Sequence, residues 1–299
     1  MRKFGIVLAL LVVLIALLVG CSGSREQDIE TILASELLRS QGIEINEPER
    51  PYYRFSARED FDIEVALHVL GEHGSYYFTP GGWTDELIGD LVAVSEDGLR
   101  FAKDFLGIEV SHPLSFVFNV TEPTDDHPMP MWGGGGVFGT SAYISMEARL
   151  LPSLIVHEAV HAILRYDERQ SNFPMPPETA LMGHAMFLEE GLCDLIDFLF
   201  AAQTEHPYRT NYGNNHLHIE ASRTLNRRNN FADEAEFGTR YPELMSYETA
   251  ASFVYFLLEH HGTIGDFMRV FDDIYLMEEV YGVSMYDMIA KWMAYLEQF

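Results

Sequence analysis

Residues 154–164 read LIVHEAVHAIL, an apolar run that is interrupted only by His157, Glu158 and His161. Residues four apart lie on the same face of a helix, so both imidazoles can reach one metal ion. Zinc suits two imidazoles and a carboxylate, with the fourth position left to water. Glu158 is then placed to take a proton from that water instead of binding the metal.

The alternative is a surface helix that carries two histidines and a glutamate by chance. A solvated helix face would not be flanked by residues as apolar as those at 154–156 and 162–164. Polar groups buried in such a helix are costly unless they are paired or bind a metal. Pro152 fits a first helical turn, which predicts a helix that begins just before the motif. The pattern therefore favours a zinc site on a buried helix.

A third ligand is expected after His161. Asp167 is a weak candidate, because it needs a sharp backbone turn at 164, where a leucine stands instead of glycine. The better candidate is Glu190, in the segment FLEEGLCDLIDF at 187–198. Glu190 and Asp194 share one helix face, as a metal ligand and an acceptor for a ligating imidazole would. An ordinary acidic helix is the alternative.

These residues resemble the gluzincin metallopeptidases, in which a glutamate on a second helix is the third zinc ligand. HEAVH at 157–161 followed by EGLCD at 190–194 is most similar to the aminopeptidase-N-like branch and its short peptidase MA-like relatives. The resemblance implies one Zn²⁺ per chain, held by His157, His161 and Glu190, with Asp194 as the second carboxylate. It covers about residues 75–299, and only the zinc motifs are specific. Here the two motifs are separated by a longer, proline-rich insertion, which costs little in loop entropy.

A tyrosine is a second feature of the resemblance. YETAASFVYFL at 247–257 is similar to the family's helix whose first tyrosine donates a hydrogen bond to the oxyanion, although the family's lysine and glycine are missing. The resemblance implies that Tyr247 stabilises the transition state. A tyrosine packed in the core is the alternative. His218, within a polar stretch at 203–228 that we expect to form a loop over the cleft, is another candidate proton donor.

GGGGVFG at 133–139 precedes a strand expected through 142–145. In zincins the strand beside the active-site helix binds the extended substrate through its backbone. Glycines allow a close approach there, which points to Gly135, Gly136 and Val137 as substrate-binding residues. A plain glycine turn is equally compatible. The motif with which aminopeptidases of this branch hold a free amine is missing, so the resemblance implies an endopeptidase or a broad oligopeptidase.

The first twenty residues are typical of an exported lipoprotein. Arg2 and Lys3 precede an apolar core that runs to Val19. LVGC at 18–21 resembles the bacterial lipobox, in which Cys21 is lipidated and becomes the first mature residue. An uncleaved anchor is the alternative, although the run is marginally short for spanning. Either way we expect a chain tethered to the cell membrane or outer membrane on its exported face.

The charge balance excludes some partners. Nineteen basic and 46 acidic residues give a net charge of −27. Removal of the leader with Arg2 and Lys3 leaves 17 basic residues against 46 acidic ones, or −29. Nucleic acid and anionic membrane surfaces are therefore excluded as partners.

The remaining cysteine and histidines suggest no further chemistry. With Cys21 lipidated, Cys193 is the only thiol, so no intramolecular disulfide forms. We expect Cys193 to be a small buried packing residue. HLH at 216–218 and HH at 260–261 lack carboxylate or cysteine partners at useful spacing and are interpreted as ordinary histidines.

Together these patterns predict an α+β, predominantly helical fold. The resemblance implies a thermolysin-like zincin domain, with a small mixed sheet beside the HExxH helix and a helical C-terminal half. We expect a signal peptide at 1–20, a tether and N-terminal helical region at 21–58, and the catalytic domain at 59–299. Periodicity predicts strands at 75–78 and 113–120 and a helix at 85–106. The expected function is a zinc-dependent peptidase acting on peptides or proteins; the alternative is a non-catalytic lipoprotein that serves as a binding or envelope-assembly module.

Overall fold

The computed structural model describes residues 44–46, 52–55, 61–120, 134–138, 140–146, 152–167, 179–204, 216–228 and 247–299. The leader at 1–20, Cys21 and the helical pattern expected around 29–38 lie outside these residues. None of the described helices combines the length and the hydrophobicity that a bilayer crossing requires.

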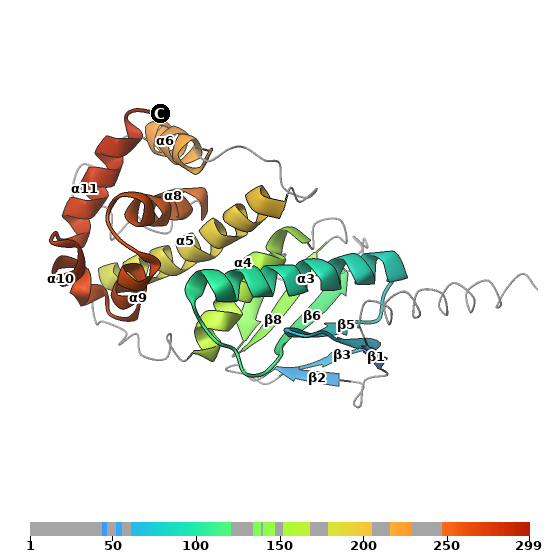
Figure 1. Ribbon diagram of the computed structural model, residues 1–299. Coiled ribbons are helices and arrows are strands. Elements are labelled where there is room, and N and C mark those ends of the chain that lie inside the picture. Colours follow the sequence, from blue (N-terminus) through green and yellow to red (C-terminus); the bar gives the residue numbers. More distant parts are fainter. Residues whose placement is uncertain are drawn as a thin grey trace, which may run out of the picture.

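A six-stranded mixed sheet lies beside the helices (Figure 1). Its strands, in spatial order, are β1 (Glu44–Asn46), β4 (Leu67–Leu70), β5 (Gly74–Phe78), β6 (Leu114–Val120), β8 (Ser141–Met146) and β7 (Gly134–Phe138). β5, β6 and β8 are parallel, whereas the pairs toward both edges are antiparallel. β7 is therefore an edge strand of this sheet. β2 (Tyr52–Phe55) and β3 (Phe61–Glu64) form a separate antiparallel pair.

Two helices pack against the sheet, α3 (Asp85–Leu106) and α4 (Pro152–Tyr166). Thr84 caps α3 by accepting a hydrogen bond from the backbone N–H of Leu87, and Gly107 ends it in the left-handed region at φ 66°. α4 carries the HExxH motif, and its apolar residues from Ile155 to Leu164 are fully buried. This helix is consequently part of the hydrophobic core and not a solvated surface element.

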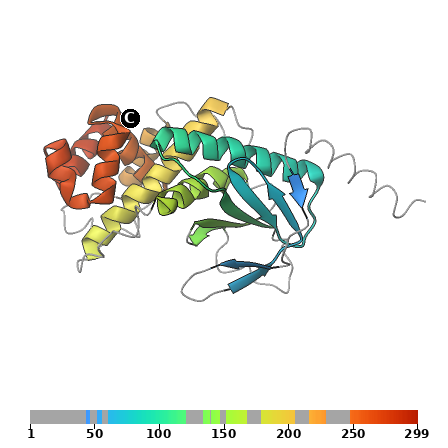
Figure 2. The ribbon, with the colours of Figure 1, turned by 60° about the horizontal axis from the view of Figure 1, so that its bottom comes forward.

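The C-terminal half is a group of helices beside this layer (Figure 2). They are α5 (Thr179–Thr204), α6 (His216–Arg228), α8 (Tyr247–His260), α9 (Ile264–Asp272), the 3₁₀ turn η2 (Ile274–Leu276), α10 (Met277–Tyr281) and α11 (Met285–Leu296). α5 packs on α4 and on α8. A Cβ atom at Gly191 would stand 2.5 Å from the carbonyl oxygen of Ala250, so glycine is what allows α5 and α8 to approach this closely.

The coarse expectation of a mostly helical chain with a small mixed sheet is confirmed, as are the strands near 75–78 and 113–120 and the helix at 85–106. One local expectation is wrong. The polar stretch predicted as a loop at 203–228 is helical from His216 onward, because Leu217, Ala221 and Leu225 recur every four residues and pack on the core. The glycine run, which the sequence left open between a strand and a turn, forms the edge strand β7 over Gly134–Phe138.

Candidate metal centre

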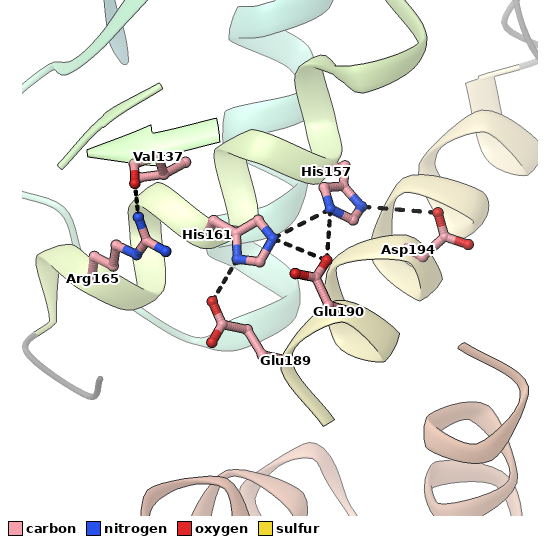
Figure 3. Close-up of polar contacts among 7 residues, drawn as sticks. All are labelled: Val137, His157, His161, Arg165, Glu189, Glu190 and Asp194. Atoms are coloured by element: carbon pink, nitrogen blue, oxygen red, sulfur yellow. Dashed lines mark hydrogen bonds and ion pairs between the residues drawn. The ribbon is translucent and has the colours of Figure 1, made fainter. Parts of the chain in front are cut away.

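Three predicted ligands converge between α4 and α5 (Figure 3). The Nε2 atoms of His157 and His161 are 3.2 Å apart. Oε2 of Glu190 lies 3.2 Å from Nε2 of His157 and 3.4 Å from Nε2 of His161. Both imidazoles come from successive turns of α4, and the carboxylate reaches them from α5.

This triangle of donor atoms has the dimensions of a metal site. Zinc binds nitrogen and oxygen at about 2.0–2.1 Å, and a tetrahedral arrangement then separates two donors by about 3.3 Å. The three observed separations agree with that value to about 0.1 Å. Oε2 of Glu190 is moreover buried and has no hydrogen-bond partner. Since an unsatisfied buried acceptor is costly, the donor set fits a divalent cation.

The charges at the centre favour an ionised Glu190. Burial opposes the charge of this carboxyl, but the neighbouring imidazoles of His157 and His161 outweigh that cost and lower its pKa. Burial likewise opposes a charged His161. Interactions with Cys193, Glu189 and Glu190 are stronger and raise the His161 pKa well above its ordinary value. These shifts favour a positively charged His161 beside a negatively charged Glu190.

The outer nitrogens of the two imidazoles face carboxylates on α5. Oδ1 of Asp194 lies 3.9 Å from Nδ1 of His157, which is longer than a hydrogen bond. Oε1 of Glu189 lies only 2.6 Å from Nδ1 of His161. Asp194 therefore faces the outer nitrogen of one imidazole, whereas sequence reasoning missed Glu189. A usable signal existed: the second histidine also needs an acceptor, and Glu189 adjoins the third ligand.

The predicted base, Glu158, is buried at 5% exposure and faces β7. A Cβ atom built on Gly135 would stand 2.1 Å from Oε1 of Glu158, so the glycine backbone lies directly against this carboxylate. Burial raises the pKa of Glu158, the two histidines lower it and Glu190 raises it; the net shift is upward. A carboxylate with a raised pKa is a better proton acceptor than an ordinary one.

Arg165 joins the active-site helix to the edge strand. Its guanidinium donates a hydrogen bond to the carbonyl oxygen of Val137 in β7. The sequence suggested only a polar end to the helix here. The three predicted substrate-binding residues Gly135, Gly136 and Val137 all lie on β7, beside the helix of the HExxH motif. Asp167, the weaker ligand candidate, is exposed just past the end of α4.

Tyr247 stands at the first position of α8, with its ring 5.5 Å from the ring of His157 and nearly perpendicular to it. The side chain is 54% exposed, so it is not a core tyrosine. Burial of its remaining surface raises the Tyr247 pKa, and the charges of Glu190 and Glu158 raise it further. A phenol that keeps its proton is a hydrogen-bond donor, as oxyanion stabilisation requires.

His218 lies among different partners. Its Nδ1 contacts Oγ of Ser252 at 2.9 Å, and its ring stacks on Tyr255. Oε2 of Glu259 lies 3.8 Å from Nε2 of His218 and 3.2 Å from Nε2 of His260. The end of α8 thus brings Glu259 close to both histidines, a contact that their spacing in the sequence does not indicate. Of the two candidate donors, Tyr247 is the one placed at the metal centre.

Cys193 is fully buried one turn along α5 from Glu190. Burial raises the pKa of its thiol to about 12. The ligand atoms of His157, His161 and Cys193 also lie within 4.8 Å of one another. Cys193 is thus a second candidate for the third donor. Oε2 of Glu190 lies 3.2 and 3.4 Å from the two imidazole nitrogens, and we assign it the third position.

No protein-family model and no curated protein matches the sequence. Two crystal structures of an M1 zinc metallopeptidase from Deinococcus radiodurans are similar to it. One, a point mutant, aligns with a TM-score of 0.40 and 10% identity over 84% of this chain and 61% of that one. The other aligns with a TM-score of 0.37 and 12% identity over 86% and 59%. This chain spans about three fifths of their length, and the similarity is too low to carry an argument about activity.

Proposed function

We propose that this protein is a zinc-dependent peptidase, and the observation that carries the proposal is the triangle of donor atoms from His157, His161 and Glu190. Its dimensions are those of a tetrahedral metal site, and one of its atoms is a buried acceptor with no donor. A buried glutamate with a raised pKa and an exposed tyrosine lie next to it. Metal, base and oxyanion donor are the groups that hydrolysis of a peptide bond requires.

Each residue has a distinct role in the proposed reaction. His157, His161 and Glu190 hold the ion, which when bound polarises the scissile carbonyl and acidifies the attacking water. Glu158 takes the proton of that water and delivers it to the leaving amine. Tyr247 donates a hydrogen bond to the oxygen that becomes negatively charged in the transition state.

The substrate is proposed to bind along β7. This strand is at the edge of the sheet, and an extended peptide pairs with such an edge through its backbone. Gly135 lies against Glu158, so a peptide that pairs here would pass close to the base. We propose an endopeptidase or oligopeptidase that acts on peptides or proteins. Its tether is the lipid on Cys21, on the exported face of the cell membrane or outer membrane.

The function is tested with a library of quenched fluorescent peptides. We expect cleavage that a chelator abolishes and that stoichiometric zinc restores. Glu158→Gln should keep its zinc and lose about 10²- to 10⁴-fold in kcat/KM, since it retains the side-chain volume but not the base. Glu86→Gln, at an exposed site on α3, is the matched control and should be unchanged.

Two outcomes would overturn the proposal. Near-normal cleavage by Glu158→Gln contradicts the mechanism. A zinc-loaded parent protein that cleaves no peptide in the library contradicts the activity itself, and it would favour the non-catalytic lipoprotein. Release of the protein from membranes by Cys21→Ser tests the tether separately from both.

A further inference from the structure

α5 directs a second metal-binding side chain at the same pair of imidazoles. Cys193 follows Glu190 by three residues, so the two side chains share one face of the helix. The ligand atoms of Cys193, His157 and His161 lie within 4.8 Å of one another, and all three residues are buried. A thiol and two imidazoles are donors that zinc prefers.

The thiol lies close enough to the two imidazoles to bind the same ion. In a tetrahedral zinc site a sulfur and a nitrogen are separated by about 3.6 Å, given bonds of about 2.3 and 2.05 Å. Because these atoms lie at most 4.8 Å apart, a shift of no more than about 1 Å brings the sulfur to that separation, which is within reach of a side-chain rotation. Glu190 occupies its own position at 3.2 and 3.4 Å from the imidazole nitrogens (Figure 3).

We infer that the Cys193 thiolate is a fourth protein ligand of the metal in the resting protein. The inference rests on the metal centre proposed above. On ligation the S–H bond breaks, a bond from sulfur to the metal forms, and the proton leaves to solvent. Four protein ligands close a zinc site, whereas a catalytic site keeps one position open for water. The resting centre is accordingly latent, and Cys193 must leave the metal before water binds.

The test uses the full chain with Cys21→Ser, in which Cys193 is the sole thiol, loaded with Co²⁺ in place of zinc. Visible d–d absorption reports that cobalt is bound, and a sulfur-to-cobalt charge-transfer band in the near ultraviolet reports a thiolate ligand. We expect both signals in this parent. Cys193→Ala should lose the charge-transfer band and bind metal at least about tenfold more weakly, while Glu190→Gln should keep the band. At equal metal loading, Cys193→Ala should turn over peptide faster than the parent.

The results separate this inference from the proposed function. Visible absorption without a charge-transfer band overturns the role of Cys193 and leaves the peptidase proposal standing. Slower turnover by Cys193→Ala at equal loading overturns the latent state. A parent that binds neither cobalt nor zinc overturns the metal centre together with the inference.

Discussion

Glu189 holds His161 from the side of the ring that faces away from the proposed metal. The 2.6 Å contact between its Oε1 and Nδ1 of His161 fixes the tautomer that leaves Nε2 free to bind the ion. Glu189→Gln replaces a charged acceptor by a neutral one, and we expect zinc affinity to fall by about 10- to 100-fold. Competition with a chelator of known affinity measures this. Glu86→Gln should bind zinc like the parent, and an unchanged Glu189→Gln would show that this contact does not support the ligand.

Tyr247 is expected to act on the transition state and not on the metal. Removal of its hydroxyl in Tyr247→Phe should lower kcat by about 10²- to 10³-fold, the usual effect of losing one oxyanion donor, and leave zinc content unchanged. Steady-state kinetics with one cleavable peptide measure kcat, and metal analysis of the same sample measures the zinc content. Tyr275→Phe, at a site that is 63% exposed, is the control. Full activity in Tyr247→Phe would mean that another group donates the hydrogen bond to the oxyanion.

The sequence predicted some residues of the site and missed others. The four-residue spacing of His157 and His161 predicts their shared face, because one helix fixes both side chains. Glu190 was identified because a carboxylate in an apolar segment needs a partner. Glu189 was missed although the second imidazole also needs an acceptor, and Arg165 was missed because its partner lies on β7. Their roles depend on how α5 and β7 pack against α4, which no spacing along the chain specifies.

Among the elements, the edge strand β7 lies directly against the helix α4 at the proposed base. A methyl group at Gly135 would meet Oε1 of Glu158 at 2.1 Å, and so either the base or the edge strand must move. We expect Gly135→Ala to lower kcat/KM by about 100-fold or more, because a misplacement of about 1 Å has that effect on catalysis. Peptide cleavage at fixed zinc loading measures the loss. Gly82→Ala, where nothing lies within 4 Å of the new methyl, should be silent, and equal activities of the two variants would place β7 away from the chemistry.

The elements that the sequence predicted well carry their own boundary signals. α3 begins after the capping Thr84 and ends at Gly107, and both are recognisable in the chain. The sequence did not decide whether β7 is a strand or a turn, because a glycine run has neither alternation of polar and apolar residues nor strand propensity. Its strand geometry comes from pairing with β8, a contact between different parts of the chain. The helix α6 was missed because its polar composition hid three apolar positions.

At the scale of the whole molecule, composition and periodicity predicted the mixture of a small sheet and many helices but not the extent of the sheet. β1 and β4 are strands of three and four residues that the sequence did not predict. They are too short to show a period and are held by pairing with each other and with β5. The turn between β4 and β5 is fixed by Glu96 on α3, which accepts the backbone N–H groups of His73 and Gly74. Such a contact between distant segments leaves no local pattern.

The stability of the whole molecule should depend on pH through His218, which packs α6 onto α8. Burial lowers the pKa of this histidine; Glu259 opposes the shift and His260 adds to it, and the net change is downward. The unfolded chain then binds a proton below about pH 6.5 that the folded chain resists. The contribution of His218 to the free energy of unfolding is therefore fully present above about pH 6.5. It is lost as the pH falls from there through the lowered pKa of the folded state.

His218→Gln removes this proton-linked contribution and leaves the other titrating groups in place. We expect the variant to be less stable than the parent at neutral pH, since Gln cannot stack on Tyr255 as the imidazole does. The gap in the free energy of unfolding should shrink as the pH falls below about 6.5, because only the parent loses the His218 term. Denaturant titrations of both proteins at a series of pH values measure the gap, with His112→Gln, at an exposed site, as the control. A gap that stays constant across this range would mean that His218 titrates alike in the folded and unfolded chains.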